Sequence, residues 1–332
     1  MQTIQHTYKN RSDLFNQIEA AYAFLSDYSD NVYELSKIFK PLVDFFYHNT
    51  KIKIPKYINT DFKPVKTYKV KNIYTVCISG GKDSIAVAKY LIDKGYKVQL
   101  YHMRGINPAY YDEFTVIPKI AECLGVSYYI EKVRLVGSHQ YIEHPMKNML
   151  IANGAINYCL ENNIYPNIVF GNYETSDITG MEFDIDAGDS RYMWDMYEQL
   201  IQTIIPDFQI YTPLKDISQT YDLIEYDKPL LINSISCMSP YRFRKSWKKR
   251  TEDKYNVELM PNRCGCCAKC CLEYMVLVDK GILDYNEAYY NHCMQILIQN
   301  TKKECGIKKP TVEQVWDRFF WYNISESHYT EN

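Results

Sequence analysis

Long apolar runs and an excess of charge of one sign are both missing from this sequence. No window in its 332 residues approaches the about 18 uncharged apolar residues that a membrane-spanning helix needs. Met1 is followed by a polar stretch rather than an apolar core, which predicts no secretory signal. The formal net charge of -2 argues against a broad, non-specific nucleic-acid surface. We therefore expect a soluble, cytoplasmic protein with no membrane partner.

Internal repeats and low-complexity segments are also missing, and the length suits one large α/β domain with an accessory piece. We expect a helical N-terminal extension over residues 1–70, an α/β domain over 71–235, and a cysteine-rich, helical C-terminal region over 236–332. In the extension, apolar residues at helical spacing predict helices over 13–25 and 33–45. Residues 51–67 are basic, contain two prolines and suggest a linker.

Strand and helix patterns alternate through the middle of the chain. Short apolar, β-rich runs predict buried strands, and segments with a helical period follow them. The predicted strands cover residues 73–78, 97–102, 127–133 and 167–171, and the predicted helices cover 84–94, 115–124 and 146–162. Because strands and helices alternate, we expect an α/β fold with a doubly wound parallel sheet and helices on both faces.

A glycine-rich loop connects the first predicted strand to the first helix. Two glycines let the backbone turn tightly and approach a ligand, and the helix N-terminus offers unpaired N–H groups to an anion. A lysine can reach phosphate oxygens, and an aspartate beside phosphates is suited to an intervening Mg²⁺. The pattern predicts a phosphate site formed by Ser79, Gly80, Gly81, Lys82, Asp83 and Ser84. The alternative interpretations are an ordinary turn and a lysine that points into solvent.

This hexapeptide resembles the SGGxDS signature of the PP-loop ATP pyrophosphatases, which have the adenine nucleotide alpha hydrolase-like fold. It does not match the Gly-x-x-x-x-Gly-Lys-Ser/Thr pattern that supports γ-phosphate transfer. The resemblance implies cleavage of ATP to AMP and pyrophosphate while a carbonyl or carboxylate is activated.

The same resemblance implies roles for residues outside the loop. His102 ends the second predicted strand and would lie near the adenine, and Gly171 ends the fourth strand near the substrate. Lys215 follows a Thr-Pro-Leu stretch and would join Lys82 and Asp83 in catalysis, with a simple surface role as its alternative. Acidic residues follow Gly171 between positions 174 and 186, and we interpret most of them as a solvated loop.

Eleven cysteines in an intracellular chain favour thiols or metal ligands over disulfides. Five of them crowd into residues 264–271, where a Cys-Gly-x-Cys-x-x-Cys spacing lets thiolates converge on one ion. We predict a closed structural Zn²⁺ site formed by Cys237, Cys264, Cys267 and Cys270, with Cys266 as an alternative ligand. An iron–sulfur cluster and a redox cysteine pair are the rival interpretations.

Together, the loop, the Thr-Pro-Leu stretch and the cysteine pattern resemble the 7-cyano-7-deazaguanine synthase family of queuosine biosynthesis over residues 72–280. The resemblance implies an ATP-dependent ligase that forms C–N bonds. Its small-molecule substrates would be a deazapurine carboxylate, 7-carboxy-7-deazaguanine, and ammonia. ATP, Mg²⁺ and a structural Zn²⁺ are the cofactors that the resemblance implies.

Two features depart from that family. A spacer of 26 residues separates Cys237 from Cys264, longer than in the synthases, and a 70-residue extension precedes the loop. The spacer is basic through 242–250 and contains Trp247, which suits contact with a nucleic acid or a protein tail, or else a solvated helix face. The sequence therefore also allows a different carboxylate or a macromolecular amine as the substrate. It allows a homo-oligomer as well.

Two other functions compete with the synthase interpretation. A PP-loop tRNA-modifying enzyme that transfers sulfur would want a cysteine pair near the loop. Cys77 lies within a predicted strand and Cys123 within a predicted helix, so neither is placed for that chemistry. A non-catalytic nucleotide-binding member of a regulatory or defence assembly is the third hypothesis, and the complete phosphate loop argues against it.

Overall fold

The structure is a computed structural model of the chain. It describes residues 3–5, 13–26, 33–47, 55–65, 68–106, 113–136, 147–172, 191–214, 217–224, 227–237, 239–306, 308–311 and 314–315. Two features predicted from the sequence lie outside these residues. They are Lys215 and the acidic run between positions 174 and 186.

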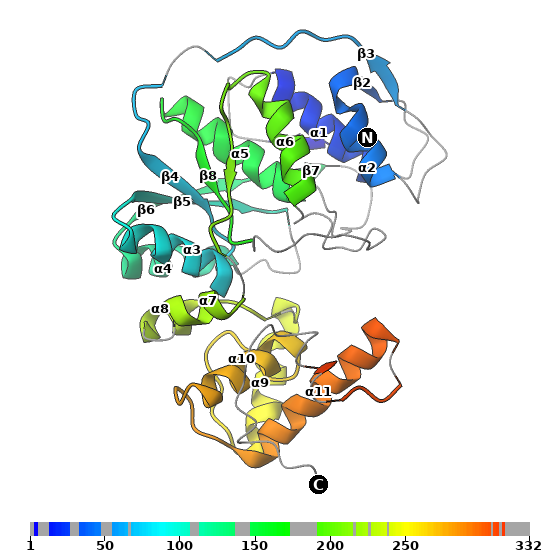
Figure 1. Cartoon of the computed structure of the whole chain (residues 1–332). Coiled ribbons are helices and arrows are strands. Elements are labelled where there is room, and N and C mark those ends of the chain that lie inside the picture. Colours follow the sequence, from blue (N-terminus) through cyan, green and yellow to red (C-terminus); the bar gives the residue numbers. More distant parts are fainter. Residues whose placement is uncertain are drawn as a thin grey trace.

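Five parallel strands form the central sheet of the α/β part (Figure 1). They are β4 (Ile73–Cys77), β5 (Lys97–Arg104), β6 (Ser127–Lys132), β8 (Asn167–Val169) and β9 (Ile210–Tyr211). Their order is β6-β5-β4-β8-β9, and each neighbouring pair is parallel. The chain builds outward from β4 to β6 and then returns to the other side of β4 for β8 and β9. This is a doubly wound sheet, and the predicted α/β fold is confirmed.

Helices cover both faces of the sheet. Successive residues of a strand point to opposite faces, so each strand contributes side chains to two separate cores. Cys77, Tyr101 and Ile168 face one core, which also contains residues of α1 (Asp13–Ser26), α2 (Lys40–Tyr47), α5 (Lys147–Glu161) and α6 (Arg191–Gln202). Val76, Leu100 and Val169 face the other core, with residues of α3 (Lys82–Asp93), α4 (Ile117–Leu124), α7 (Ile217–Ile224) and α8 (Lys228–Asn233). The 3-10 turn η3 (Glu113–Thr115) leads into α4.

The N-terminal helices belong to the first of these cores. Leu14 and Phe15 of α1 are fully buried in the same cluster as residues of α5 and α6. Packing is therefore continuous across residue 70, where the sequence suggests a boundary, and the boundary itself stays a prediction.

One predicted helix in this region is partly wrong. Within residues 33–45 the chain forms a strand, β2 (Glu34–Ser36), and a 3-10 turn, η1 (Lys37–Phe39), before α2 begins. Pro41 explains the late start, because proline has no N–H and is tolerated only in the first turn of a helix.

The predicted linker also contains a strand, β3 (Lys56–Ile58), which pairs in parallel with β2. A separate antiparallel pair joins β1 (Thr3–Gln5) to β7 (Arg134–Val136).

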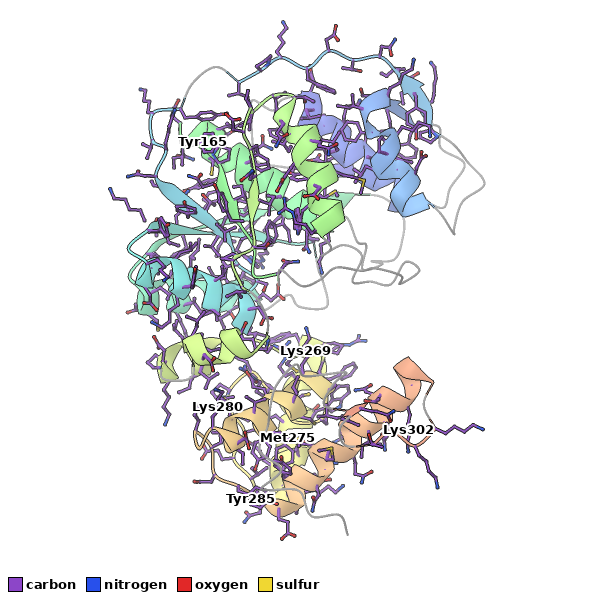
Figure 2. The ribbon with its side chains drawn as sticks, viewed as in Figure 1. Tyr165, Lys269, Met275, Lys280, Tyr285 and Lys302 are labelled. Atoms are coloured by element: carbon purple, nitrogen blue, oxygen red, sulfur yellow. The ribbon has the colours of Figure 1, made fainter. Side chains whose placement is uncertain are left out.

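The C-terminal helices lie below the sheet in Figure 1, beyond α7 and α8. They are α9 (Tyr241–Tyr255), α10 (Ala268–Asp279) and α11 (Glu287–Cys305), and α10 and α11 share a core of their own. Leu277 of α10 reaches instead into the core beneath the sheet. Lys280, labelled in Figure 2, places its Nζ 2.8 Å from Oδ1 of Asp222 on α7. The region is thus joined to the α/β part through α10. Within the described ranges, no helix combines the length and hydropathy that crossing a bilayer requires.

Candidate functional site

The phosphate loop lies where the strand order of the sheet reverses. It follows β4, and the neighbouring strand β8 begins the other half of the sheet. In open α/β sheets, ligands bind in the crevice outside the carboxyl ends of the strands at this reversal. The fold therefore places the predicted loop at the position where such sheets bind their ligands.

Hydrogen bonds within the loop hold its backbone in a tight turn. Gly80 has a φ of +82°, in the left-handed region that favours glycine. Ser79 Oγ accepts a hydrogen bond from the Gly81 N–H at 3.2 Å, and Ser84 Oγ donates to the Gly81 carbonyl at 2.9 Å. Gly81 is the N-cap of α3 and offers no side chain to cap the helix. A helix N-terminus of this kind is suited to an anion.

Lys82 and Asp83 form an ion pair at the start of α3, with Nζ and Oδ1 2.5 Å apart. The Lys82 side chain is 9% exposed, so the alternative in which this lysine points into solvent is wrong. The Asp83 side chain is 35% exposed. Its carboxylate therefore keeps the access that a metal ion carried by a nucleotide would need.

Gly171 packs directly against this helix start. A Cβ at position 171 would lie 2.6 Å from the carbonyl carbon of Asp83 and 2.7 Å from the backbone nitrogen of Ser84. Only a residue without a side chain lets the end of β8 touch the first turn of α3. The structure thus places Gly171 beside the loop as a position of close backbone approach.

His102 supports the strand that leads into the loop. It is only 4% exposed, and its Nδ1 lies 2.8 Å from the carbonyl oxygen of Ile78, the residue before Ser79. Since a carbonyl can only accept, Nδ1 carries the proton. Burial is the main cause that lowers the pKa of His102, so the neutral ring is favoured. Contact with an adenine stays a prediction for this residue.

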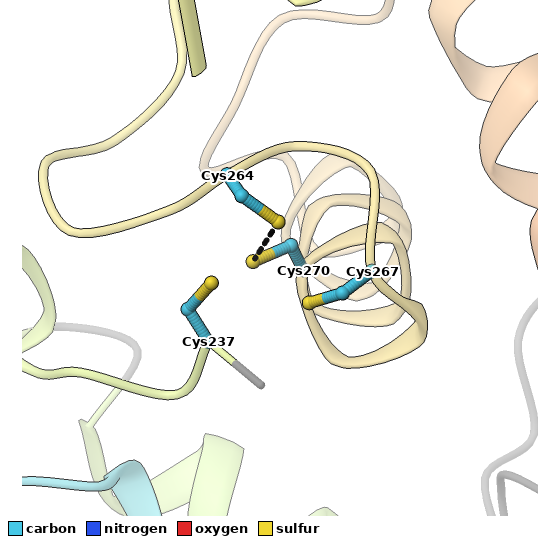
Figure 3. A group of neighbouring side chains, drawn as sticks. All are labelled: Cys237, Cys264, Cys267 and Cys270. Carbon is cyan, nitrogen blue, oxygen red and sulfur yellow. Dashed lines mark hydrogen bonds between the residues drawn. The ribbon is translucent and has the colours of Figure 1, made fainter. Parts of the chain in front are cut away.

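Four cysteines from two segments of the chain converge in the C-terminal region (Figure 3). The Sγ atoms of Cys237, Cys264, Cys267 and Cys270 all lie within 4.8 Å of one another. Tetrahedral coordination with bonds of about 2.3 Å separates sulfur atoms by about 3.8 Å, close to the 3.9 Å between Cys264 and Cys270. The four thiols therefore fit a single metal ion, and sulfur atoms this close leave no room for a cluster of several irons.

Hydrogen bonds favour a thiolate within this group. The bond from the Cys237 thiol, followed by those from its other cysteine neighbours, lowers the pKa of Cys264. The Ser239 hydroxyl also donates to Cys264 Sγ at 3.0 Å, and the Cys266 N–H donates to it at 3.4 Å. Donors of this kind orient and stabilise metal-bound thiolates. The surroundings of Cys264 are thus those of a ligand.

The alternative ligand Cys266 lies at the edge of the group. Its Sγ is 3.7 Å from Cys264 Sγ, but it does not belong to the set in which all four sulfur atoms are mutually close. Cys271 is fully buried in the core of α10 and α11.

The spacer between Cys237 and Cys264 contains α9. Two of its basic residues hold the helix in place: Arg244 is buried and donates to the Ser239 carbonyl at 3.2 Å, and Lys248 donates to the Leu259 carbonyl. Phe243 and Trp247 stack, with ring centroids 5.4 Å apart. The basic residues on the exposed side are Arg242, Lys245, Lys249 and Arg250.

Contacts to the loop also come from residues that the sequence analysis did not single out. Ile235 donates its N–H to the Gly80 carbonyl at 2.7 Å. The Lys82 N–H donates to Ser236 Oγ at 3.4 Å. The sequence offers one indication of a role for Ser236, which is that it directly precedes the predicted ligand Cys237.

Comparison with protein-family models gives no match, and comparison with curated proteins gives none. Among solved structures, the chain resembles a predicted subunit of a tRNA methyltransferase from Methanocaldococcus jannaschii, with 16% identity and a TM-score of 0.28. That match covers 55% of this chain and 88% of the other. It also resembles NMN synthetase from Francisella tularensis, with 14% identity, a TM-score of 0.29, and coverage of 57% and 73%. Neither likeness is strong enough to assign a family or an activity.

Proposed function

We propose that this chain uses ATP to adenylate a carboxylate, with release of pyrophosphate, and that ammonia then forms a C–N bond at the activated carbon. The proposed substrate is 7-carboxy-7-deazaguanine, with 7-cyano-7-deazaguanine or a related deazaguanine transfer as the outcome. The observation that carries the proposal is the position of the phosphate loop at the strand reversal, at the N-terminus of α3, where the N-cap residue Gly81 has no side chain to cap the helix. The choice of substrate rests on the resemblance in the sequence.

In the proposed reaction, a carboxylate oxygen attacks the α-phosphorus, the bond to the bridging oxygen breaks, and pyrophosphate leaves. Ammonia attacks the acyl carbon, the C–O bond breaks, and AMP leaves with that electron pair. The nitrogen loses a proton, and the product is an amide. The amide oxygen then attacks the α-phosphorus of a second ATP and a second pyrophosphate leaves. Loss of AMP and of the protons on nitrogen gives the nitrile.

The chain would contribute mainly position and charge. The N–H groups at the start of α3 would bind the pyrophosphate end of ATP, and the Lys82 ammonium would add a positive charge beside it. Asp83 would hold a Mg²⁺ that the nucleotide brings, through its partly exposed carboxylate. When bound, Mg²⁺ neutralises charge on the leaving pyrophosphate.

We assign a structural role to the metal at Cys237, Cys264, Cys267 and Cys270, and propose Zn²⁺. Four thiolates close the coordination sphere and leave no position for a substrate. The ion would tie residue 237, next to the phosphate loop, to the start of α10.

The test is incubation of the purified chain with ATP, Mg²⁺, ammonium and 7-carboxy-7-deazaguanine, followed by mass spectrometry. The expected result is the nitrile with AMP and pyrophosphate. AMP and pyrophosphate with only an adenylate or amide would support the activation step and point to another final acceptor. A lack of substrate-dependent AMP would contradict the synthase proposal.

Two variants make the result specific to the loop. Asp83→Asn should lower turnover by a factor on the order of 10², because the carboxylate beside the phosphates is lost. Asp93→Asn is the matched control, since Asp93 lies at the other end of α3 and pairs with Lys89 on the surface. A non-catalytic nucleotide-binding protein would instead keep its biological effect in Asp83→Asn.

A second candidate function is modification of an RNA, and α9 is the observation that favours it. Its exposed basic residues suit phosphates, and the Phe243–Trp247 pair suits stacking on bases. Cys77 is poorly suited to sulfur transfer, because burial raises its pKa well above the usual value and keeps that thiol neutral. Binding of single-stranded RNA should weaken with salt, and Lys245→Glu with Lys249→Glu should reduce the salt slope. Equal binding by wild type and variant would exclude this face.

A further inference from the structure

Residues 234–237 connect the cysteine group to the phosphate loop. Ser234, Ile235, Ser236 and Cys237 are all buried, with exposed fractions of 0%, 6%, 9% and 3%. Ser234 ends α8 in an extended conformation, with a ψ of 154°. Each residue makes a contact with a different part of the site. We refer to residues 234–237 as the connecting segment.

At one end, the segment is held by a buried ion pair of the C-terminal region. Arg263 and Glu273 are 2% and 1% exposed and form a two-bond pair, with Nη2 donating to Oε1 at 2.7 Å. The same guanidinium donates to the Ser234 carbonyl and, at 2.7 Å, to its Oγ. Glu273 belongs to α10, the helix that carries Cys270.

In its middle, the segment contacts the loop through backbone and hydroxyl groups. Ile235 N–H donates to the Gly80 carbonyl at 2.7 Å, a strong bond that places the segment directly beside the loop. Ser236 Oγ accepts from the Lys82 N–H at 3.4 Å. At this distance the second bond is longer than the usual range of about 2.7–3.2 Å, so it is the weaker of the two contacts.

At the other end, Cys237 enters the group of four thiols. Its Cα is about 3.8 Å from that of Ser236, so a movement of the cysteine is passed to the residue that touches Lys82. An ion would fix Cys237 relative to Cys264, Cys267 and Cys270. Without an ion, this end is held by the hydrogen bond that the Ser239 N–H donates to Cys237 Sγ at 3.4 Å and by packing within the cysteine group.

We propose that the metal held by the four cysteines positions the phosphate loop through residues 234–237, with Ser236 as a positioning residue, so that nucleotide and metal bind cooperatively. The inference rests on the proposed function, since it requires that the loop binds a nucleotide. Cooperativity of this kind is reciprocal: if the metal strengthens nucleotide binding, the nucleotide strengthens metal binding by the same factor. We expect the stronger metal binding to appear as slower loss of the metal.

The test uses the full chain loaded with Zn²⁺ and a non-hydrolysable ATP analogue. Calorimetry first measures the affinity of the analogue, and transfer of Zn²⁺ to a coloured chelator is then followed with and without saturating analogue. We expect the analogue to slow Zn²⁺ transfer by about fivefold or more. We also expect its affinity to fall by a similar factor once the metal has been removed.

Variants test the route of the coupling. Ser236→Ala should keep a full equivalent of Zn²⁺ and bind the analogue, but the ratio of the two transfer rates should fall toward one. Ser246→Ala is the matched control, because Ser246 is exposed on α9 and, within the described part of the chain, its hydroxyl donates to the Phe243 carbonyl of its own helix turn. A purely structural role for Ser236 would change stability and leave the ratio as it is in the wild type.

The outcomes separate this inference from the proposed function. If the analogue binds but Zn²⁺ transfer proceeds at the same rate with and without it, the coupling is wrong and the proposed function stands. If Ser236→Ala retains the wild-type ratio, the assigned route is wrong. If no analogue binds to the Zn²⁺-loaded chain, the proposed function fails and this inference fails with it.

Discussion

At the scale of single residues, two positions decide the geometry of the phosphate loop. Gly171 lets β8 touch the first turn of α3, and His102 holds the carbonyl of Ile78 where β4 ends. Neither effect requires contact with a ligand. Gly171 and His102 both act on the loop backbone, which would bind the ligand. Substitutions at these two positions should therefore change the loop geometry without removing a group that takes part in the reaction.

Gly171→Ala is expected to weaken nucleotide binding and to destabilise the fold by about 1–3 kcal/mol. The added Cβ would lie 2.6 Å from a backbone atom of Asp83, which cannot move aside as a flexible side chain could. Denaturant unfolding and calorimetry with an ATP analogue measure the two effects. Gly95→Ala is the control, since its φ of +82° costs stability at the far end of α3 with no atom within 4 Å of the new Cβ. Equal nucleotide affinity in both variants would contradict the prediction.

His102 should make the protein less stable in mild acid. Burial lowers its pKa in the folded state, whereas in the unfolded chain the pKa is about 6.5. As the pH falls below about 6.5, the unfolded state takes up a proton that the folded state does not, so the free energy of unfolding decreases. The slope approaches about 1.4 kcal/mol per pH unit until the folded-state pKa is reached. Urea unfolding across this range should show a smaller slope in His102→Gln than in the wild type, with the remaining slope expected from groups such as His292, whose pKa burial also lowers.

At the scale of elements, α10 joins three parts of the molecule. Its start carries Cys270, its middle contributes Glu273 to the buried pair with Arg263, and its end reaches the core beneath the sheet through Leu277. The buried pair is the most sensitive of the three because both charges are removed from water.

Glu273→Gln is therefore expected to lower the free energy of unfolding by about 3–5 kcal/mol, since it leaves the Arg263 charge without its partner. The double variant Arg263→Met with Glu273→Leu should recover much of this loss, because no buried charge remains. Denaturant unfolding of Arg263→Met, of Glu273→Leu and of the double variant gives the coupling energy. A loss of less than about 1 kcal/mol in Glu273→Gln would show that the pair is not desolvated as described.

At the scale of the whole molecule, the C-terminal region is expected to depend on metal while the far face of the sheet does not. The metal ligands join residue 237 to α10, whereas α1, α2, α5 and α6 share the core on the opposite face. Chelation should therefore reduce hydrogen-exchange protection in α9, in the start of α10 and in residues 234–237, with α1 and α5 unchanged. A Cys266→Ser variant should retain the metal and the wild-type pattern. A uniform change over the chain would contradict this division.

Much of the α/β part could be predicted because its signals are local. The strand 73–78 and the helix 84–94 agree with β4 and α3 to within two residues, since apolar periodicity and a glycine turn act over a few positions. The loop from Ser79 to Ser84 is contiguous, and the cysteine spacing confines three thiols to one turn and the start of a helix. Sites formed by residues that are close together along the chain can therefore be predicted from the sequence.

The rest depends on partners that are distant along the chain. Residues 34–36 have a helical pattern but form a strand, because residues 56–58 supply the backbone hydrogen bonds. Gly171 matters through α3, and Ser236 through Lys82, which lies 154 positions earlier. The sequence of this protein contains a nucleotide loop and a metal ligand set as separate motifs. Long-range packing places residues 234–237 between them, since a contact between distant segments leaves no local pattern.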